Sequence, residues 1–302
     1  MFPGLALLAR ALLTTLAWAG PLSYSGSEFP VEVAENRNRR GEEYLLKFPS
    51  PLKSPFAANN TVWGHLLLPE GKGPFPCILV LPVMAAPNLW IEERFIRRFL
   101  RDGFAVLWIE MPYQFHRRPH PSVASGQGFL ARTPSRLAFN FRQAALDARR
   151  ALAWLRRHPD IDPKRIGLFG VSLGAFVGAS VYSADPSPRY AVFLMGGADF
   201  PSLVAESSMT GPALRRMGLD PASLREAWKG LDPLDYTQAN AGKKLLLFNV
   251  RSDRVVPRPN ALKLKEAFPS SRQVWLPFGH YSAILHLIWI PRHVSKHFRL
   301  NL

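Results

Sequence analysis

The sequence predicts an α/β fold in which a doubly wound, mostly parallel sheet carries helices on both faces. Three observations lead to this fold class. Short apolar runs bounded by glycine or proline, which are typical of buried strands, alternate with longer stretches of helical periodicity. Such alternation is the pattern of parallel strands joined by covering helices. The size also fits, because 302 residues, of which 47% are hydrophobic, can bury one large core.

The first half of the chain opens the sheet. Two strands with proline-rich segments between them are followed by a continuous apolar strand, an amphipathic helix stopped by Asp102-Gly103, and another buried strand. These elements are expected at Tyr44–Phe48, Thr61–Leu68, Pro76–Pro82, Trp90–Arg101 and Phe104–Ile109. A long connection rich in proline, histidine and arginine then runs from Met111 to Thr133 and leads into a helix at about Pro134–His158.

The second half repeats strand and helix around one interruption. Residues 199–241 contain short helical pieces between two strands, which predicts a small cap insertion. The other expected elements are strands at Arg165–Gly170, Tyr190–Met195, Lys244–Val250 and Arg272–Leu276, and helices after Ser172, at Asn260–Phe268 and from Ser282 onward.

The chain divides into three parts before any site is considered. Residues 1–19 are typical of a secretory signal peptide, because the apolar run Leu5–Leu16 ends in Ala17-Trp18-Ala19. Residues 20–41 are polar and expected to be irregular, and residues 42–302 form the α/β domain. A signal peptide implies a secreted or periplasmic protein. If the run is only a short amphipathic leader, the protein is cytoplasmic.

The formal net charge of +16 raises the question of an anionic partner. The arginines are scattered in pairs, without the aromatic-interleaved basic block of a nucleic-acid reader, so no nucleic-acid partner is expected. A solvated basic surface explains the charge, and electrostatic attraction to anionic surfaces remains an alternative. The longest apolar stretch after the leader, Tyr281–Ile290, is far shorter than the ~20 residues that span a bilayer.

Neither a metal nor a cofactor is indicated. The chain has no His-Glu-x-x-His motif, no clustered carboxylates and no Gly-x-Gly-x-x-Gly opening a helix. Cys77 is the only cysteine, which excludes an intrachain disulfide, and its apolar strand favours a buried core residue.

The pentapeptide Gly170-Val171-Ser172-Leu173-Gly174 points to nucleophilic chemistry. It lies between an expected strand and an expected helix, where Gly-x-Ser-x-Gly forms a sharp turn that projects the serine hydroxyl from the sheet. The flanking glycines remove the Cβ atoms that would clash there. Ser172 is therefore the candidate nucleophile.

A serine nucleophile needs a base, and the base needs a carboxylate to orient it. Asp253 and His280 follow the strands that end at Val250 and Leu276, on the edge where Ser172 is expected. They give the chain order Ser, Asp, His. Asp253 has the alternative role of a helix or turn cap, and Asp199 is a rival acid. The competing histidines are His65, His116, His120, His158, His286, His293 and His297.

An oxyanion formed during acyl transfer needs two backbone donors. One is expected from the amide of Leu173, directly after the nucleophile. The other is expected from Val83 or Met84, in the loop after the strand that ends at Leu81-Pro82. Pro82 has no N–H to donate.

These residues resemble the motifs of the α/β-hydrolase superfamily, most nearly its dienelactone hydrolase-like, acetyl-xylan-esterase-like or prolyl-oligopeptidase-like branches. The resemblance covers Tyr44 to the C-terminus and includes the serine turn, Ser252–Pro257, Gly279-His280 and the segment Asp160–Gly167. It implies a Ser-His-Asp hydrolase that works through an acyl-enzyme on an ester, less often on an amide or thioester.

Two departures from the superfamily pattern bear on the expected function. Many members have His-Gly or Gly-Gly where this chain has Val83-Met84-Ala85-Ala86, which leaves the second oxyanion donor open. Dienelactone hydrolases proper use cysteine, whereas this chain has serine, which favours esterase activity.

The expected function is therefore that of a serine esterase acting on a small-molecule or polymer-attached ester. Two alternatives remain open: a serine peptidase or amidase of the prolyl-oligopeptidase-like type, and a non-catalytic protein of the same fold that binds anionic envelope polymers.

Overall fold

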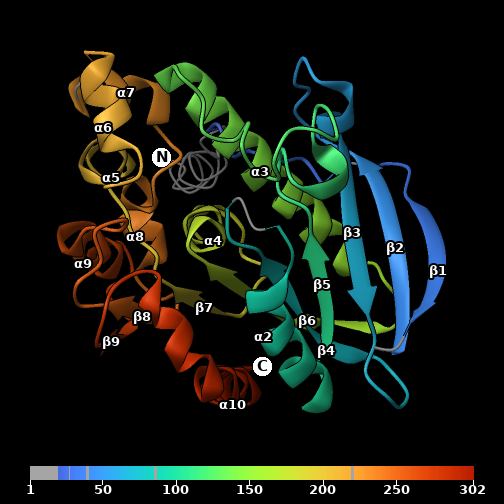
Figure 1. The fold of residues 1–302 in the computed structure, drawn as a ribbon. Coiled ribbons are helices and arrows are strands. Elements are labelled where there is room, and N and C mark those ends of the chain that lie inside the picture. The colour runs from blue at the N-terminus through green and yellow to red at the C-terminus, as the bar shows by residue number, and fades with distance from the viewer. Residues whose placement is uncertain (1–19, 27, 39–40, 85–86, 219–220) are drawn as a thin grey trace, which may run out of the picture.

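A mixed sheet runs through the whole molecule. The computed structural model describes residues 20–26, 28–38, 41–84, 87–218 and 221–302. Within these ranges the sheet has nine strands in the order β1-β2-β3-β5-β4-β6-β7-β8-β9 (Figure 1). Pairing is antiparallel from β1 to β3 and between β3 and β5, and parallel from β5 to β9. The strands are Glu32–Asn38, Gly41–Pro49, Thr61–Leu67, Phe75–Leu81, Ala105–Ile109, Ile161–Val171, Tyr190–Leu194, Leu245–Val250 and Arg272–Leu276.

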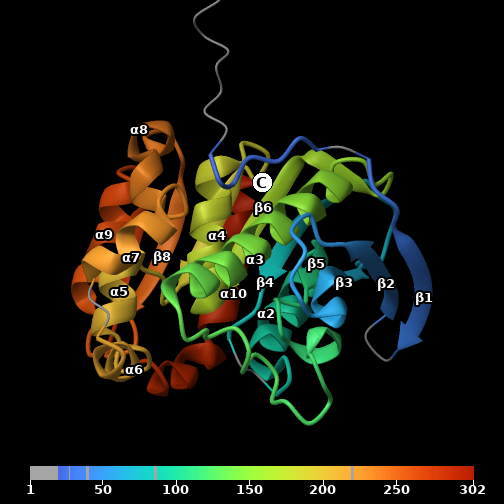
Figure 2. The same cartoon turned by 90° about the horizontal axis from the view of Figure 1, so that it is seen from above.

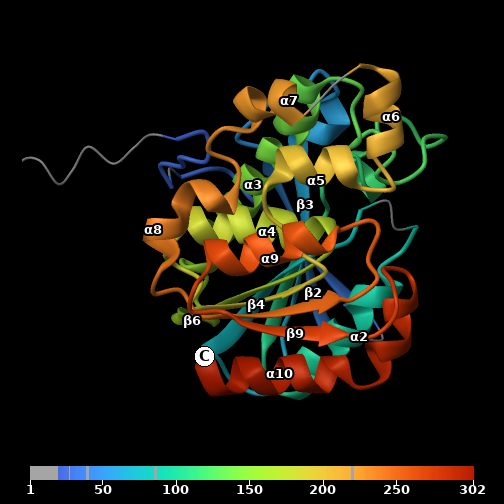
Figure 3. The same cartoon turned by 90° about the vertical axis from the view of Figure 1, so that its left-hand side faces the viewer.

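Helices cover both faces of the sheet, as the alternation of elements predicts. Helices α2 (Trp90–Arg101) and α10 (Ile290–Asn301) lie on one face, while α3 (Pro134–Leu155), α4 (Leu173–Ala184) and α9 (Arg258–Ala267) lie on the other (Figure 3). Buried side chains accordingly form two hydrophobic clusters, one on each face. The mostly parallel sheet with helices on both faces is therefore confirmed.

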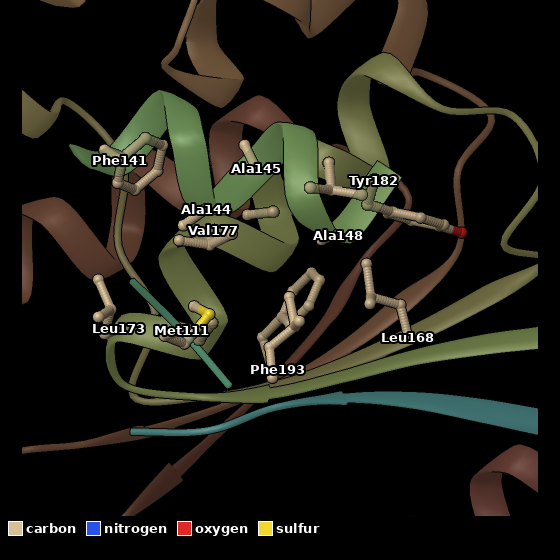
Figure 4. Packing of buried hydrophobic residues seen from close by; sticks show 14 of the residues in the cluster. Met111, Phe141, Ala144, Ala145, Ala148, Leu168, Leu173, Val177, Tyr182 and Phe193 are labelled. Carbon is tan, nitrogen blue, oxygen red and sulfur yellow. The ribbon is translucent and has the colours of Figure 1, made fainter. Parts of the chain in front are cut away.

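Helix α3 approaches α4 closely because the side chains between them are small. Ala144, Ala145 and Ala148 of α3 are fully buried and lie beside Val177 of α4, with Phe193 of β7 beneath (Figure 4). Small residues let helix backbones approach each other, while the large aromatic ring fills the space above the sheet. This packing fixes α4, the helix that begins at the serine turn.

The segment between β7 and β8 forms a layer of short helices outside α3 and α4 (Figure 3). It is tied to α3 through aromatic rings, because Trp228 packs against Phe141 and Phe200 with centroid distances of 5.1 and 5.4 Å. The elements are α5 (Phe200–Glu206), α6 (Gly211–Arg216), α7 (Pro221–Trp228), η3 (Pro233–Tyr236) and α8 (Thr237–Asn240). Three further 3₁₀ turns occur at η1 (Ala57–Asn60), η2 (Phe115–Arg117) and η4 (Ser282–Ile288).

Two expectations differ from the structure. Residues 20–41 are not irregular throughout, because Glu32–Asn38 forms β1 and pairs along its length with β2. Strand β1 is rich in polar residues and lacks the apolar pattern of a buried strand. It lies at the edge of the sheet, at the end of the molecule opposite α9 (Figures 1 and 2). The single closing helix expected from Ser282 is divided into η4 and α10, and Pro291 lies in the first turn of α10. The expected signal peptide, residues 1–19, lies outside the described residues.

Candidate active site

Ser172 lies on a strained turn between β6 and α4. Its backbone angles are φ 51° and ψ −113°, and residues other than glycine rarely adopt this conformation. The turn is held because the Ser172 N–H donates to the Leu194 carbonyl of the neighbouring strand β7 at 2.9 Å. Strain of this kind persists only where the surroundings enforce it, and it is often found at functional sites.

The two glycines of the pentapeptide are required by close backbone contacts. A Cβ on Gly170 would lie 2.2 Å from the Gly174 carbonyl oxygen. A Cβ on Gly174 would lie 1.9 Å from the carbonyl oxygen of Leu81, the last residue of β4. The serine turn therefore packs directly against the end of β4, with no side chain between the two backbones.

Asp253 is oriented by its own loop after β8. Its Oδ1 accepts hydrogen bonds from the N–H groups of Val255 and Val256 at 2.9 and 2.8 Å. These bonds fix the carboxylate and leave Oδ2 to bond elsewhere. Asp253 therefore has the turn-capping role that the sequence allows, through Oδ1, while its Oδ2 contacts His280.

His280 joins the acid to the serine. Its Nδ1 lies 2.8 Å from Asp253 Oδ2, and its Nε2 lies 3.3 Å from Ser172 Oγ. A carboxylate only accepts hydrogen bonds, so Nδ1 carries the proton and Nε2 offers a lone pair to the serine hydroxyl. The side chains of His280 and Asp253 are only 10% and 4% exposed, so the hydrogen bond between them is shielded from water.

Leu173 and Val83, both expected as oxyanion donors, differ in their availability. Leu173 is the first residue of α4, so its N–H has no acceptor within the helix. The N–H of Val83 is already engaged, because it donates to Glu92 Oε1 at 2.8 Å. This bond occupies the Val83 N–H, which favours Met84, the next residue along the loop, as the second donor.

Two polar side chains that the sequence does not single out hold the Val83 peptide from both sides. Glu92 of α2 accepts from its N–H, and Gln114 Nε2 donates to its carbonyl at 2.6 Å. Glu92 is fully buried, and burial raises the pKa of its carboxyl above the ordinary 4.5, although the Val83 N–H opposes the shift. Glu92 lies in an amphipathic helix with four arginines, so its sequence resembles that of a solvated surface residue.

A cavity of about 280 Å³ opens beside Ser172 and His280. Phe129 from the 111–133 connection and Trp228 from the segment between β7 and β8, here called the cap segment, line it. Phe115 of the same connection packs instead against Trp108, with ring centroids 6.1 Å apart. The walls come from β-strand ends, from α3 and α4, from the cap segment and from η4. The 111–133 connection and the segment between β7 and β8 therefore both reach the cavity.

The rival acid and histidines are placed elsewhere. Asp199 is the N-cap residue of α5 in a left-handed conformation. His65 and His116 lie at Glu110, where His116 Nδ1 is 2.6 Å from Oε1 and His65 Nε2 is 3.6 Å from the same oxygen. His286, His293 and His297 lie on η4 and α10. The carboxylate at His280 is that of Asp253.

Three further features that the sequence analysis raises are a metal site, the cysteine thiol and a membrane span. In the described ranges, no group of three or more histidine, cysteine or carboxylate side chains is placed to hold a metal ion. Burial raises the pKa of the Cys77 thiol to about 12, so it stays protonated in the core. None of the described helices is long and apolar enough to cross a bilayer.

Sequence comparison finds a distant relative for part of the chain. No family model matches. Esterase FrsA of Enterobacter sp. (strain 638) is 25% identical over 174 residues, which are 57% of this chain. The chain spans only 38% of the length of that relative.

Solved structures resemble almost the whole chain. The acetyl xylan esterase from Paenibacillus sp. R4 has a TM-score of 0.65 at 15% identity, covering 91% of this chain and 90% of that one. Acetyl xylan esterase 1 from Thermoanaerobacterium sp. JW/SL YS485 has a TM-score of 0.64 at 16% identity, covering 88% and 91%. At such identities the likeness is one of fold, and the chain has the fold of the α/β-hydrolase superfamily that its motifs resemble.

Proposed function

We propose that the chain is a serine hydrolase of carboxylic esters that acts through an acyl-enzyme. The observation that carries the proposal is the continuous contact from Asp253 Oδ2 through His280 to Ser172 Oγ, with distances of 2.8 and 3.3 Å. The geometry is that of a nucleophile, a base and an orienting acid. The matched relative and both structural neighbours are named esterases, which supports an ester substrate before an amide.

In the first half of the reaction Ser172 Oγ attacks the carbonyl carbon while His280 Nε2 takes its proton. The oxyanion of the tetrahedral intermediate accepts from the N–H groups of Leu173 and Met84. The ester C–O bond then breaks, and His280 returns the proton to the leaving oxygen, which departs as the alcohol. Water then attacks the acyl-serine while His280 Nε2 takes its proton; the acyl–Oγ bond breaks, the carboxylic acid leaves, and His280 returns the proton to Ser172 Oγ.

Two measurements on the purified full chain test this mechanism. A fluorophosphonate should label wild type at Ser172, and Ser172→Ala should lower kcat for p-nitrophenyl butyrate by about 10⁵-fold or more. Ser208→Ala, at an exposed serine of the cap segment, is the matched control and should keep both labelling and rate. If Ser172→Ala hydrolyses the ester as fast as wild type, the assignment is wrong.

We further propose, from the apolar run alone, that residues 1–19 direct export. The exported protein should then begin at Gly20, which N-terminal sequencing of the material outside the cytoplasm checks. An unprocessed N-terminus on the exported protein would contradict a cleaved leader.

A further inference from the structure

The side chains that line the cavity at Ser172 are mostly apolar. Apart from Ser172 and His280, the side chains with polar atoms that line it are Ser207, Thr210, Tyr281 and Trp228, whose buried Nε1 has no hydrogen-bond partner. The first two are used inside the protein, because Ser207 Oγ accepts from the Met209 N–H at 3.2 Å and Thr210 Oγ1 donates to the Val204 carbonyl at 2.5 Å. A sugar carries several hydroxyls, so a sugar bound there would lose more hydrogen bonds to water than these few groups could replace.

The cavity also extends over both faces of the sheet edge. One part, the cap limb, is lined by residues that pack with the α3 and α4 side, including Phe129, Phe141, Phe200 and Trp228. The other part, the η4 limb, is lined by residues that pack with the α2 and α10 side, including Val171, Phe248, Leu287 and Ile290. Ser172 directly follows β6, at the edge that separates the two faces.

We propose that the substrate is an ester with an apolar group on each side of its carbonyl, one group in each limb. This inference rests on the proposed function, since it assigns the substrate class of the same site. With the carbonyl carbon at Ser172, the acyl and alkoxy groups diverge, and each limb offers an apolar wall to one of them. Burial of each methylene should raise kcat/KM roughly fourfold, until a limb is filled.

Three esters test the substrate class. Methyl hexanoate and pentyl acetate are isomers that extend only the acyl or only the alkoxy side of methyl acetate. Each adds four methylenes, so both should exceed methyl acetate in kcat/KM by up to about 250-fold, whereas acetylated xylose should resemble methyl acetate. If methyl acetate or acetylated xylose is hydrolysed as well as the longer esters, the substrate class is wrong even though the proposed mechanism holds. If Ser172 is not labelled by a fluorophosphonate, the proposed function itself is wrong.

Matched tryptophan variants test the two limbs separately. Met209 and Ile284 line the cap limb and the η4 limb and are 39% and 43% exposed, so a larger side chain fits without unfolding the core. Each of Met209→Trp and Ile284→Trp should lower kcat/KM about tenfold or more for one of the two isomeric esters and spare the other. Leu262→Trp, at a 40% exposed position of α9 outside the cavity, should affect neither. Equal effects of both limb variants on both esters would exclude two separate limbs.

A second inference comes from the outer surface next to the site. The segment that contains His280 and η4 exposes large apolar side chains, with Tyr281 at 73% and Ile288 at 84%. We call this surface the apolar rim, and its members are Phe278, Tyr281, Ile284, Leu285, Ile288 and Trp289. Contiguous exposed apolar residues on a folded protein mark an interaction surface more often than chance exposure.

The part of the chain that carries the apolar rim is rich in basic residues. Residues 245–302 contain nine lysines and arginines but only two acids, Asp253 and Glu266, and Asp253 is held by His280. Arg251, Arg254 and Arg292 are exposed in this part of the chain. Helix α2, which contacts η4, adds exposed Arg94 beside the exposed ring of Trp90. Apolar side chains surrounded by cations fit a surface that is apolar within and anionic outside.

We propose that the apolar rim docks on an anionic lipid surface, so that the mouth of the cavity faces the lipid. The rim residues enter the boundary between headgroups and acyl chains, while the surrounding arginines contact the lipid phosphates. An ester dissolved in the lipid then reaches the cavity without crossing water. The exposed aromatic and aliphatic side chains thereby gain the burial that they lack in the isolated protein.

Vesicle binding tests the docking surface with the whole protein. Wild type should co-sediment with vesicles of phosphatidylglycerol and phosphatidylcholine, less so at 0.5 M NaCl, and much less with phosphatidylcholine alone. The pair Leu285→Ser and Ile288→Ser, at rim residues that do not line the cavity, should weaken binding about tenfold or more, without changing kcat for a soluble ester. Val33→Ser, at an exposed apolar residue of β1, is the control and should bind as wild type.

Two results would overturn the docking surface. One is binding to anionic vesicles that the rim substitutions leave unchanged. The other is a homodimer in sedimentation equilibrium that the same substitutions dissociate, because the rim would then be covered by a second copy of the chain.

Discussion

Two histidine–carboxylate pairs lie at the same edge of the sheet, and the histidine of one of them contacts a serine hydroxyl. Asp253 follows β8 and holds His280 Nδ1 at 2.8 Å, while Glu110 follows β5 and holds His116 Nδ1 at 2.6 Å. The bonds are alike in length and partner. The difference is on the far side of each ring, since His280 Nε2 meets Ser172 Oγ, whereas the ring of His116 is stacked on Trp63 with centroids 4.1 Å apart.

The comparison teaches that an oriented imidazole is not by itself a catalytic base. Catalysis also requires a hydroxyl on the open nitrogen and space for a substrate beside it. Among the described residues no hydroxyl bonds to the His116 ring, and neither Glu110 nor His116 lines the cavity at Ser172, so the contacts of this pair to β3 and to the 111–133 connection make it a structural link. The following substitutions test this division of roles.

The largest expected effect is that of Asp253→Asn. The asparagine amide cannot hold the proton on Nδ1, so His280 would present the wrong tautomer to Ser172, and kcat should fall about 10⁴-fold with the fold intact. The corresponding change at the other pair, Glu110→Gln, should leave kcat for a soluble ester within about twofold. Steady-state kinetics with both variants checks the contrast, and a comparable loss in Glu110→Gln would refute it.

A smaller effect, on stability alone, is expected from His116→Gln. The change removes the 2.6 Å bond to a buried carboxylate and the stacked ring on Trp63. The free energy of unfolding should fall by about 1–3 kcal/mol, because the Glu110 carboxylate loses a partner in the interior. Urea denaturation measures the loss. Retained stability together with a reduced kcat would assign His116 to the reaction instead.

The smallest effect is a pH dependence that Glu92 contributes. Burial raises the pKa of this carboxyl in the folded protein above 4.5, so the native state binds its proton more tightly than the unfolded state. Stability from Glu92 is therefore largest below pH 4.5 and falls as pH rises toward the folded pKa. Glu92→Gln keeps an oxygen acceptor for Val83 and removes the titration. Unfolding free energies at pH 4 and pH 7 should show wild type losing stability relative to the variant, and a constant difference would contradict the shift.

The contact of Ser172, His280 and Asp253 was predictable because the local sequence encodes the position of each residue. The serine turn is encoded by five consecutive residues, and Asp253 and His280 each follow a short apolar strand. In a parallel sheet the ends of such strands meet at one edge, so sequence order alone brings the three loops together. The bounds of α2 and β9 also agree with those expected, because glycine or proline stops both elements close by.

What the sequence could not predict depends on contacts between distant segments. Glu92 and Gln114 reach Val83 from a helix and a loop that no local pattern connects with it. Strand β1 is stabilised by backbone pairing with β2 rather than by an apolar face. The two limbs of the cavity likewise arise only when side chains from both faces of the sheet meet around Ser172.

The direct contact of Gly174 with the Leu81 carbonyl has a consequence for how the site can change over time. Main-chain atoms alone set the spacing between the serine turn and the loop that begins at Pro82, so no side-chain substitution in the cavity can alter this spacing without moving the backbone. Substrate preference is then free to evolve, or to be engineered, through the cavity walls. The serine turn keeps its position against β4 while the side chains that line the cavity are substituted.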